Sequence, residues 1–411
     1  MRKDRVILHC DCNSFFASVE TALNPGYRGV PMAVCGSQEE RHGIVLAKND
    51  LAKAHGIKTA DTVYAAKKLC PNLVIAEPHY DEYVKFSSLV NNIYSDYTDI
   101  IEPFGIDESW LDVTASERLF GSGCDIAEEI RERVKREVGI TVSIGVSFNK
   151  VFAKLGSDYK KPDAVTVIDR TNFEKIVYPL RVSEMLFVGD KTVDTLSSFG
   201  VHTIGELASL PSELLSRKMG KYGEMLSRYA RGLDDDPVIP PTDESKSVGN
   251  GYTFKRDLVS LDEIRSGVDF LSEEIARRLR EKGQLCSTVS VSLKDEYMRV
   301  VQRQHPMPHP SDLCREISVC AMQIVRDFWC EGRPVRSITV TALNLLSKSS
   351  VVDQIDMFEH YDCGEADHRR KARCEELAVD SIRRKYGPSS IVRGASIDGD
   401  IGIYDPKTNK S

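Results

Sequence analysis

The feature that most constrains this chain is an apolar run with a carboxylate near its end. Arg5 to Cys12, RVILHCDC, has the apolar residues typical of a buried strand, and Asp11 lies close to its last residue. The C-terminal end of such a strand can present a side chain to a cleft. A second acidic group, Asp107 and Glu108, occupies the polar tip of a predicted hairpin between Ile100 and Thr114. If the strand and the hairpin share a sheet, these three carboxylates lie close together.

Such a group of carboxylates favours a particular chemistry. Three carboxylates in one place repel one another unless a cation neutralises them. Hard oxygen ligands favour Mg²⁺, which takes one or two carboxylates together with phosphate oxygens. Two such ions, about 3.5–4 Å apart, can activate an attacking hydroxyl and stabilise a leaving pyrophosphate. From spacing alone, the plainer alternative is favoured, in which Asp107 and Glu108 form only a polar turn.

The composition is that of an ordinary globular protein. The 411 residues predict two to four domains, and 41% hydrophobic with 28% charged residues excludes fibrous, collagen-like and wholly disordered chains. The apolar runs are shorter than the roughly 18–20 residues that span a membrane, and no signal-peptide core follows the N-terminus. We therefore expect a cytoplasmic protein with no membrane partner. The 11 cysteines form no CxxC pair, which argues against a zinc site and a disulfide framework. A net charge of −7 is weak evidence against a nucleic-acid partner.

The predicted elements divide the chain into segments of different kinds. Up to about residue 170, strands and helices mix around a predicted sheet, and short helices follow from about 171 to 233. A polar stretch, Asp234 to Ser247, has the composition of a linker. The order strand, helix, two strands, helix, strand then predicts one compact α+β domain. Its expected elements are 248–254, 261–282, 287–294, 297–303, 311–329 and 336–343, with a charged helix over about 367–386.

Three segments carry a resemblance to a known family. They are HCDCNSFFASVE (9–20), FGIDESWLDV (104–113) and SIGVSFNKVFAKLGSDYKKPD (143–163). In this order they resemble the palm of the Y-family translesion DNA polymerases, and the sequence is most similar to the DNA polymerase IV branch. The resemblance covers residues 1–240 clearly and 245–345 in architecture.

The resemblance implies an α+β, multidomain fold shaped like a right hand. It also implies a template-directed, low-fidelity DNA polymerase that adds dNTPs to a primer 3′-hydroxyl in translesion synthesis, DNA repair and replication. The alternative is a non-catalytic, clamp-tethered DNA-binding factor that keeps the fold. The expected parts are a ferredoxin-like palm (1–20 and 77–170), small fingers (21–76), a helical thumb with a helix-hairpin-helix (171–238), a βαββαβ little finger (245–345) and a tail (346–411).

The resemblance also assigns the metal site. Asp11, Asp107 and Glu108 match the catalytic, metal-binding carboxylates, and Glu108 is also the expected active-site acid. The carbonyl of Cys12 is the expected additional ligand, and two Mg²⁺ ions are the expected cofactors. Family members usually have a second Asp two residues after the first, where this chain has Asn13, and we expect that position to be structural.

Further residues are assigned to the incoming nucleotide. Phe16 matches the steric gate, an aromatic ring under the sugar that excludes a 2′-hydroxyl, although a core aromatic is the plainer interpretation. Lys161 matches the lysine that contacts the triphosphate, since a flexible ammonium suits a mobile polyanion. In the finger segment 46–58, Asp50 and Lys53 stand where the family has a Tyr and an Arg. Lys53 keeps the charge but loses the forked guanidinium, and Asp50 would repel a triphosphate.

The expected partners are primer–template DNA, dNTPs and a sliding clamp, bound by a monomer. The segment LFVGDKTVDTLSSFGVHTIGELASLP (186–211) resembles a helix-hairpin-helix. Its turn, with Gly189 and Lys191, would hold the DNA backbone without reading the base sequence. An ordinary helical hairpin is the alternative, and Asp190 in the turn weakens the match.

A pentapeptide after the last predicted strand resembles the clamp-binding peptide of bacterial DNA-acting proteins. Gln354 is expected at the rim of a pocket, Met357 and Phe358 in an apolar groove, and Asp356 beside them. A pentapeptide alone is weak evidence, and its place after the little-finger strands strengthens the interpretation.

Overall fold

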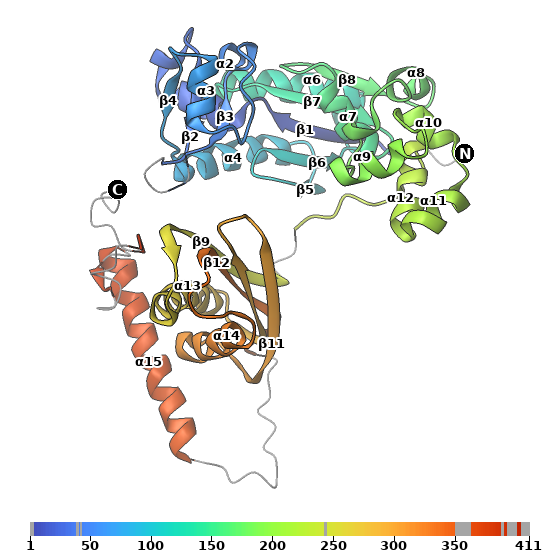
Figure 1. Ribbon diagram of the computed structural model, residues 1–411. Helices are drawn as coiled ribbons and strands as arrows, with labels where there is room; N and C mark the ends of the chain where they lie inside the picture. The colour runs from blue at the N-terminus through green and yellow to red at the C-terminus, as the bar shows by residue number, and fades with distance from the viewer. Residues whose placement is uncertain are drawn as a thin grey trace. The chain divides into compact units, whose positions relative to one another are not determined.

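The computed structural model describes residues 4–37, 41, 43–241, 245–349, 363–387, 390–392 and 401–403 (Figure 1). The chain divides into two compact units, Met1–Gly36 with Ile44–Thr242, and Ser37–Gly43 with Asp243–Ser411. Each unit has its own hydrophobic core. Among the described residues, no helix has the length and apolar character needed to cross a membrane.

A five-stranded sheet lies at the centre of the first unit, in the order β5-β6-β1-β7-β8. The middle strand is β1 (Ile7–Cys12), all of whose residues are buried, and both of its neighbours run antiparallel to it. The predicted strand and the predicted hairpin are thus neighbours in one sheet. The other strands are β5 (Ile101–Pro103), β6 (Glu108–Asp112), β7 (Val142–Ser147) and β8 (Val165–Ile168).

Side chains of β1 alternate between the two faces of this sheet. Leu8, Cys10 and Cys12 point into the main core of the unit, whereas Ile7 packs on the opposite face against Ala153. The helices of the main core are α1 (Phe15–Leu23), α4 (Tyr80–Ser95) and α6 (Gly123–Arg133) (Figure 1). The last of these continues into the π-helix η2 (Val134–Val138). The helix on the opposite face of the sheet is α7 (Lys150–Tyr159).

The position of α7 follows from a cap and from two glycines. The Asn149 side chain accepts a hydrogen bond of 2.8 Å from the Phe152 amide, which caps the start of the helix. Gly145 in β7 and Gly156 in α7 then allow the helix to lie very close to the sheet. A Cβ at Gly145 would come 1.8 Å from the Ala153 carbonyl oxygen. The helix therefore lies at a fixed, short distance from the strands.

Two further groups of elements complete the first unit. One is built on a three-stranded sheet of order β3-β2-β4, and the other is helical and has its own core. The first group comprises η1 (Pro25–Tyr27), β2 (Met32–Cys35), β3 (Val45–Lys48), α2 (Asp50–Ala54), α3 (Val63–Leu69) and β4 (Val74–Ala76). The second comprises α8 (Phe173–Val177), η3 (Val182–Glu184), α9 (Asp190–Ser197), α10 (Ile204–Ser209), α11 (Ser212–Met219) and α12 (Lys221–Ala230). One short helix outside both groups, α5 (Glu117–Phe120), precedes α6.

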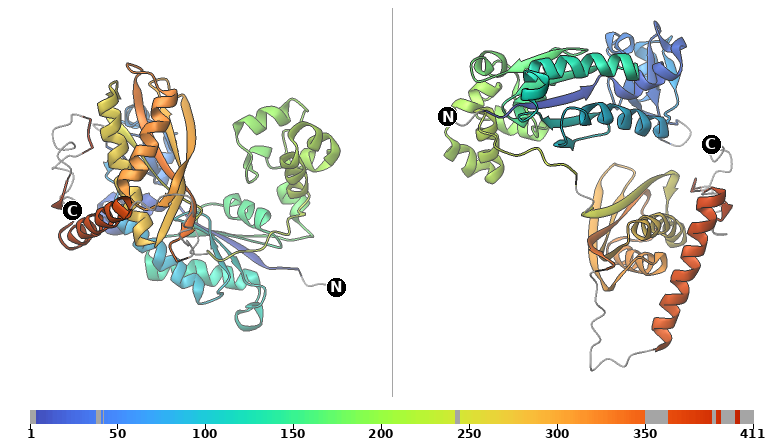
Figure 2. Two further views of the ribbon diagram at one scale, coloured as in Figure 1. Left: turned by 90° about the horizontal axis from the view of Figure 1, so that it is seen from below. Right: turned by 180° about the vertical axis from the view of Figure 1, so that it is seen from behind.

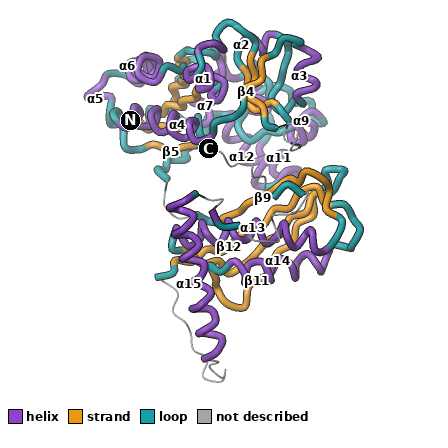
Figure 3. Tube along the Cα trace, turned by 90° about the vertical axis from the view of Figure 1, so that its left-hand side faces the viewer, coloured by secondary structure: helices purple, strands orange, loops and turns teal. Residues whose placement is uncertain are grey.

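The second unit has the predicted strand, helix, strand, strand, helix, strand order. Its sheet has the order β11-β10-β12-β9, and α13 and α14 pack side by side against it (Figure 3). A last helix lies beside α13, where Arg280 forms an ion pair of 2.7 Å with Asp380 (Figure 2). The elements are β9 (Ser247–Leu258), α13 (Leu261–Glu281), β10 (Gln284–Lys294), β11 (Val300–Ser311), α14 (Cys314–Phe328), β12 (Val335–Ser347) and α15 (Cys363–Tyr386).

One strand differs clearly from its prediction. The strand expected over 297–303 continues as β11 to Ser311, through Pro306, Pro308 and Pro310. β11 is an edge strand of its sheet, where a proline without an N–H need not break a ladder hydrogen bond. Pro306 pairs with Thr288, and the register with β10 shifts between Pro306 and Ser311, so Pro308 and Pro310 lie in an irregular part of the ladder.

We expect Gly145→Ala to destabilise the first unit by about 3 kcal/mol, because the added methyl group must displace α7. Gly189→Ala is the control, since a Cβ at that position meets nothing within 4 Å and only the N-cap preference of α9 is lost, at a cost of about 1 kcal/mol or less. Urea unfolding of both variants, followed by circular dichroism, measures the difference. Equal unfolding midpoints would show that the contact between α7 and β7 is not tight.

Candidate active site at the end of strand β1

Three residues on one face of β1 meet three positions spaced four apart along α7 and the residues just after it. Ile7 packs with Ala153. His9 Nδ1 lies 2.8 Å from Ser157 Oγ. Asp11 Oδ2 accepts a hydrogen bond of 2.6 Å from Lys161 Nζ, just beyond the end of the helix. Along β1 the contacts change from apolar at Ile7 to polar at His9 and charged at Asp11. The charged contact therefore lies near the C-terminal end of β1, which we call the edge of the sheet.

The structure brings the acids predicted from the sequence to this edge. Asp11 pairs directly with Glu108 in the β1–β6 register, which places their side chains on the same face of the sheet. Asp107 comes just before β6, and its carbonyl accepts a hydrogen bond of 3.0 Å from the Cys12 amide. The strand and the hairpin, nearly a hundred residues apart in sequence, are therefore joined at the point where the carboxylates lie.

Two lysines compensate the negative charge at this edge. Lys161 donates to Asp11, and Lys154 Nζ donates to Glu108 Oε2 over 2.6 Å. Burial raises the pKa of Asp11 to about 7, against the opposing effect of Lys161. Burial alone would also raise the pKa of Glu108, but its contacts with His9 and Lys154 lower it to about 2. Burial and the charge of Glu108 raise the pKa of Asp107.

The carboxylates and lysines at this edge determine whether a metal ion can bind there. Within the described ranges, no three His, Cys, Asp or Glu side chains form a group that could hold a metal ion as they stand, and Asp11 and Glu108 face lysines instead. The donor set nevertheless suits a hard divalent cation, because it consists of carboxylate oxygens. Burial and the charge of Glu108 raise the pKa of Asp107, and a divalent ion bound at this edge would oppose both effects.

Phe16 is held by an aromatic stack that the sequence analysis did not identify. Its half-buried ring lies parallel to Tyr83, with centroids 4.1 Å apart and planes at 11°, and Tyr80 meets it edge-on. The Tyr83 hydroxyl donates to Glu20 over 2.5 Å, and His79 contacts the same carboxylate. An acid four residues after Phe16 on the apolar side of α1 was the available sequence signal, since a buried acid requires partners.

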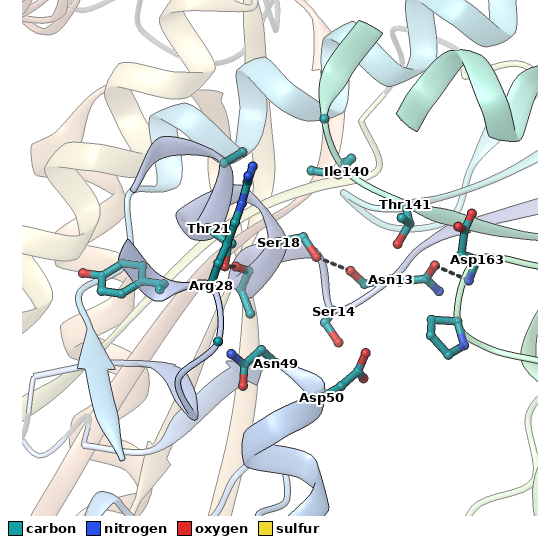
Figure 4. A pocket seen from close by; sticks show the side chains of 16 residues that line it. Asn13, Ser14, Ser18, Thr21, Arg28, Asn49, Asp50, Ile140, Thr141 and Asp163 are labelled. Carbon is teal, nitrogen blue, oxygen red and sulfur yellow. Dashed lines mark hydrogen bonds between the residues drawn. The ribbon is translucent and has the colours of Figure 1, made fainter. Parts of the chain in front are cut away.

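A cavity of about 350 Å³ lies beside the first turn of α1 (Figure 4). Ser14 has a left-handed conformation (φ 46°), and no side chain caps the α1 amides. Asp50 lines the same cavity, whereas Lys53 is exposed and does not line it. Asp50 lies in the first turn of α2, where the helix dipole stabilises a negative charge. Polar residues make up much of the lining: Asn13, Ser14, Ser18, Thr21, Arg28, Asn49, Asp50, Thr141 and Asp163.

The residues predicted to bind DNA and the sliding clamp are not among those described at this edge of the sheet. Gly189 is the N-cap of α9, and Lys191 is exposed in the first turn of that helix. The clamp-binding residues Gln354, Asp356, Met357 and Phe358 lie outside the described residues.

Comparison with known proteins identifies the family. The impB/mucB/samB family matches residues 10–158, and its C-terminal domain matches residues 245–357. The DNA polymerase IV of Acetivibrio thermocellus is 45% identical over 95% of this chain and 97% of its own length. That of Moorella thermoacetica is 40% identical over 98% of both. A Y-family DNA polymerase chimera of known structure has a TM-score of 0.75 at 24% identity, over 83% of this chain and 99% of its own.

The chain therefore belongs to the Y-family DNA polymerases, in the DNA polymerase IV branch. The predicted family is confirmed, and so is the α+β, multidomain fold class of a right-hand polymerase.

We expect Tyr83→Phe to lower the free energy of unfolding by about 1–2 kcal/mol, because the buried Glu20 carboxylate loses a hydrogen-bond donor. The phenylalanine ring introduced at position 83 can still stack on Phe16, so the preference for dNTPs over rNTPs should not change. Thermal unfolding and single-nucleotide incorporation measure the two effects separately. Unchanged stability would contradict the role given to Glu20.

Proposed function

We propose that the edge of the palm sheet at Asp11, Asp107 and Glu108 is the catalytic site of this translesion DNA polymerase. The chain is a DNA-directed DNA polymerase, which depends on a divalent metal and acts on a primer–template and dNTPs. The observation that carries the assignment is the direct register pairing of Asp11 with Glu108 beside two lysines. Like charges are placed opposite each other in a sheet at a cost in stability, which a catalytic use explains.

The proposal assigns two Mg²⁺ ions to this edge. The carboxylates of Asp11, Asp107 and Glu108 would hold them, together with the carbonyl of Cys12. When bound, such ions activate the primer 3′-hydroxyl and stabilise the leaving pyrophosphate. Lys161 and Lys154 already supply positive charge to Asp11 and Glu108. We propose that Lys154 keeps Glu108 ionised, whereas Asp11, whose pKa burial raises to about 7, would ionise fully when a divalent ion binds.

The proposal places the nucleotide between Phe16 and the start of α1. The uncapped amides of α1 would donate hydrogen bonds to the triphosphate, because the first turn of a helix attracts anions. Lys161 would move from Asp11 to the phosphates once a metal ion neutralises that carboxylate. Lys53 is exposed one turn along α2 and would add charge at the outer end. Stacked on Tyr83, Phe16 would form a rigid floor under the sugar and exclude a 2′-hydroxyl.

The wider assembly belongs to the same proposal. The N-terminal turn of α9, with Gly189 and Lys191, would contact the DNA backbone. The peptide containing Gln354, Asp356, Met357 and Phe358 would bind a sliding clamp, and the polymerase would act as a monomer in the bacterial cytoplasm, at the nucleoid. The alternative of a non-catalytic clamp-tethered factor receives no support from the relatives, which are named as polymerases.

Primer extension with Mg²⁺ and single dNTPs tests the catalytic assignment. We expect Asp107→Ala with Glu108→Ala to lose at least about 10³-fold in rate, since the metal ligands are removed. Glu128→Ala with Glu129→Ala, a neighbouring pair of exposed acids on α6, is the matched control and should extend normally. Extension that survives the first pair of substitutions would overturn the assignment.

Substitution of the gate tests the position of the sugar. Phe16→Val should raise rNTP incorporation relative to dNTP by about 10²-fold, because a smaller side chain leaves room for the 2′-hydroxyl. Phe15→Val is the control, since Phe15 is buried in the main core beside it. Unchanged discrimination in Phe16→Val would show that the ring does not face the sugar.

A further inference from the structure

A buried histidine lies directly behind the proposed catalytic Glu108. His9 is completely buried, with its ring edge-on to Trp110. Its Nδ1 lies 2.8 Å from Ser157 Oγ, and its Nε2 lies 3.3 Å from Glu108 Oε2. Throughout the described part of the chain, Nε2 is one of the few buried polar atoms with no hydrogen-bond partner in its present geometry. Such an atom aimed at a charged oxygen requires an explanation.

The His9 ring and the Ser157 hydroxyl have few protons for the hydrogen bonds around them. A neutral imidazole carries one proton, on either Nδ1 or Nε2. Ser157 also has one hydroxyl proton, which points to the Lys154 carbonyl over 2.8 Å. In that arrangement His9 must donate from Nδ1 to Ser157, and the lone pair of Nε2 faces the Glu108 carboxylate. A lone pair opposite a carboxylate in a buried site is repulsive.

A second arrangement removes the repulsion with a small turn of the ring or of the carboxylate, because the present 3.3 Å contact does not have the geometry of a hydrogen bond. If the Ser157 hydroxyl donates to Nδ1, the ring proton is placed on Nε2 and points at Glu108 Oε2. The Lys154 carbonyl loses one partner but lies inside α7, where it also accepts the amide hydrogen bond from Asp158. The exchange therefore leaves no buried group unsatisfied. Rotation of the Ser157 hydroxyl, the other tautomer of His9 and that small turn are sufficient to make it.

We propose that His9 is a positioning residue, which donates from Nε2 to Glu108 Oε2 and fixes the orientation of that carboxylate. This inference rests on the proposed function of Glu108. Lys154 Nζ donates to the same oxygen. In the described part of the chain, both contacts of the Glu108 carboxylate go to Oε2. Oε1 is thereby left to face the cation and the substrate.

Nuclear magnetic resonance of the full chain, labelled with ¹⁵N in its histidine rings, tests the hydrogen bond directly. We expect the resonance that is lost in His9→Gln to show the tautomer protonated at Nε2. In Glu108→Gln the Nε2 shift should change, because its acceptor is then an amide. A ring protonated at Nδ1, or a His9 resonance unchanged by Glu108→Gln, would overturn the proposal.

Kinetics test whether the hydrogen bond positions the carboxylate. The amide of His9→Gln reaches the place of Nε2, whereas that of His9→Asn reaches only the place of Nδ1. We expect His9→Asn to lower kcat about tenfold or more while KM for dNTP and DNA affinity stay the same, and His9→Gln to restore most of kcat. A merely structural histidine would give equal losses in both variants, and that result would overturn the proposal.

Two controls distinguish failure of the proposed role of His9 from failure of the proposed function of Glu108. Ser147→Ala removes another buried hydroxyl of the palm, which donates to the Ile168 carbonyl over 2.7 Å, and should leave kcat unchanged. If Glu108→Gln itself extends primers normally, the proposed function of Glu108 fails, whatever His9 does. If Glu108→Gln is inactive but His9→Asn matches the unsubstituted chain, only the role of His9 fails.

Discussion

The first unit depends on placing like charges at one edge of a sheet and holding them there. Two carboxylates about 5 Å apart repel by about 3 kcal/mol at an effective dielectric constant near 20, a large fraction of the stability of a typical domain. Asp11 and Glu108 are directly opposite in the register. Each has its own lysine, at 2.6 Å. These ion pairs offset the repulsion, and they oppose the rise in the pKa of both carboxylates that burial causes.

The lysines are in place because of how α7 packs. Gly145 and Gly156 allow the helix to lie against β7 without intervening side chains. The spacing of Ala153, Ser157 and Lys161 then matches alternate residues of β1. The helix α7 and the residues just after it thus supply first the apolar support, then the polar contact and then the countercharge along β1. The proposed chemistry at Asp11 depends on a packing contact further along the same strand.

Much of the fold could be predicted because its determinants are local. The apolar run of β1, the hairpin around Asp107 and the strand and helix order of the second unit all appear in the sequence as periodicity and turns. β11 was predicted too short, because Pro306, Pro308 and Pro310 suggest the end of a strand unless its edge position is known.

The supporting residues of the site could not be predicted for a different reason. Lys154 and His9 contact Glu108, and Glu20 accepts from Tyr83, across long sequence separations that no local pattern reveals. The three carboxylates were found through the family motifs, since spacing alone favoured a polar turn. Asp50 was predicted to repel a triphosphate. That repulsion stays a prediction, and the structure shows only that Asp50 lies in the first turn of α2, where the helix dipole stabilises its charge.

The most direct test of this account is a count of divalent ions at the sheet edge. Electron paramagnetic resonance can measure Mn²⁺ bound to the chain with a dideoxy-terminated primer–template and a dNTP, which together cannot react. The account predicts about two ions per chain, and fewer in Asp11→Asn. Mn²⁺ binding that is the same in Asp11→Asn, or that does not exceed the ion carried by the dNTP alone, would contradict it.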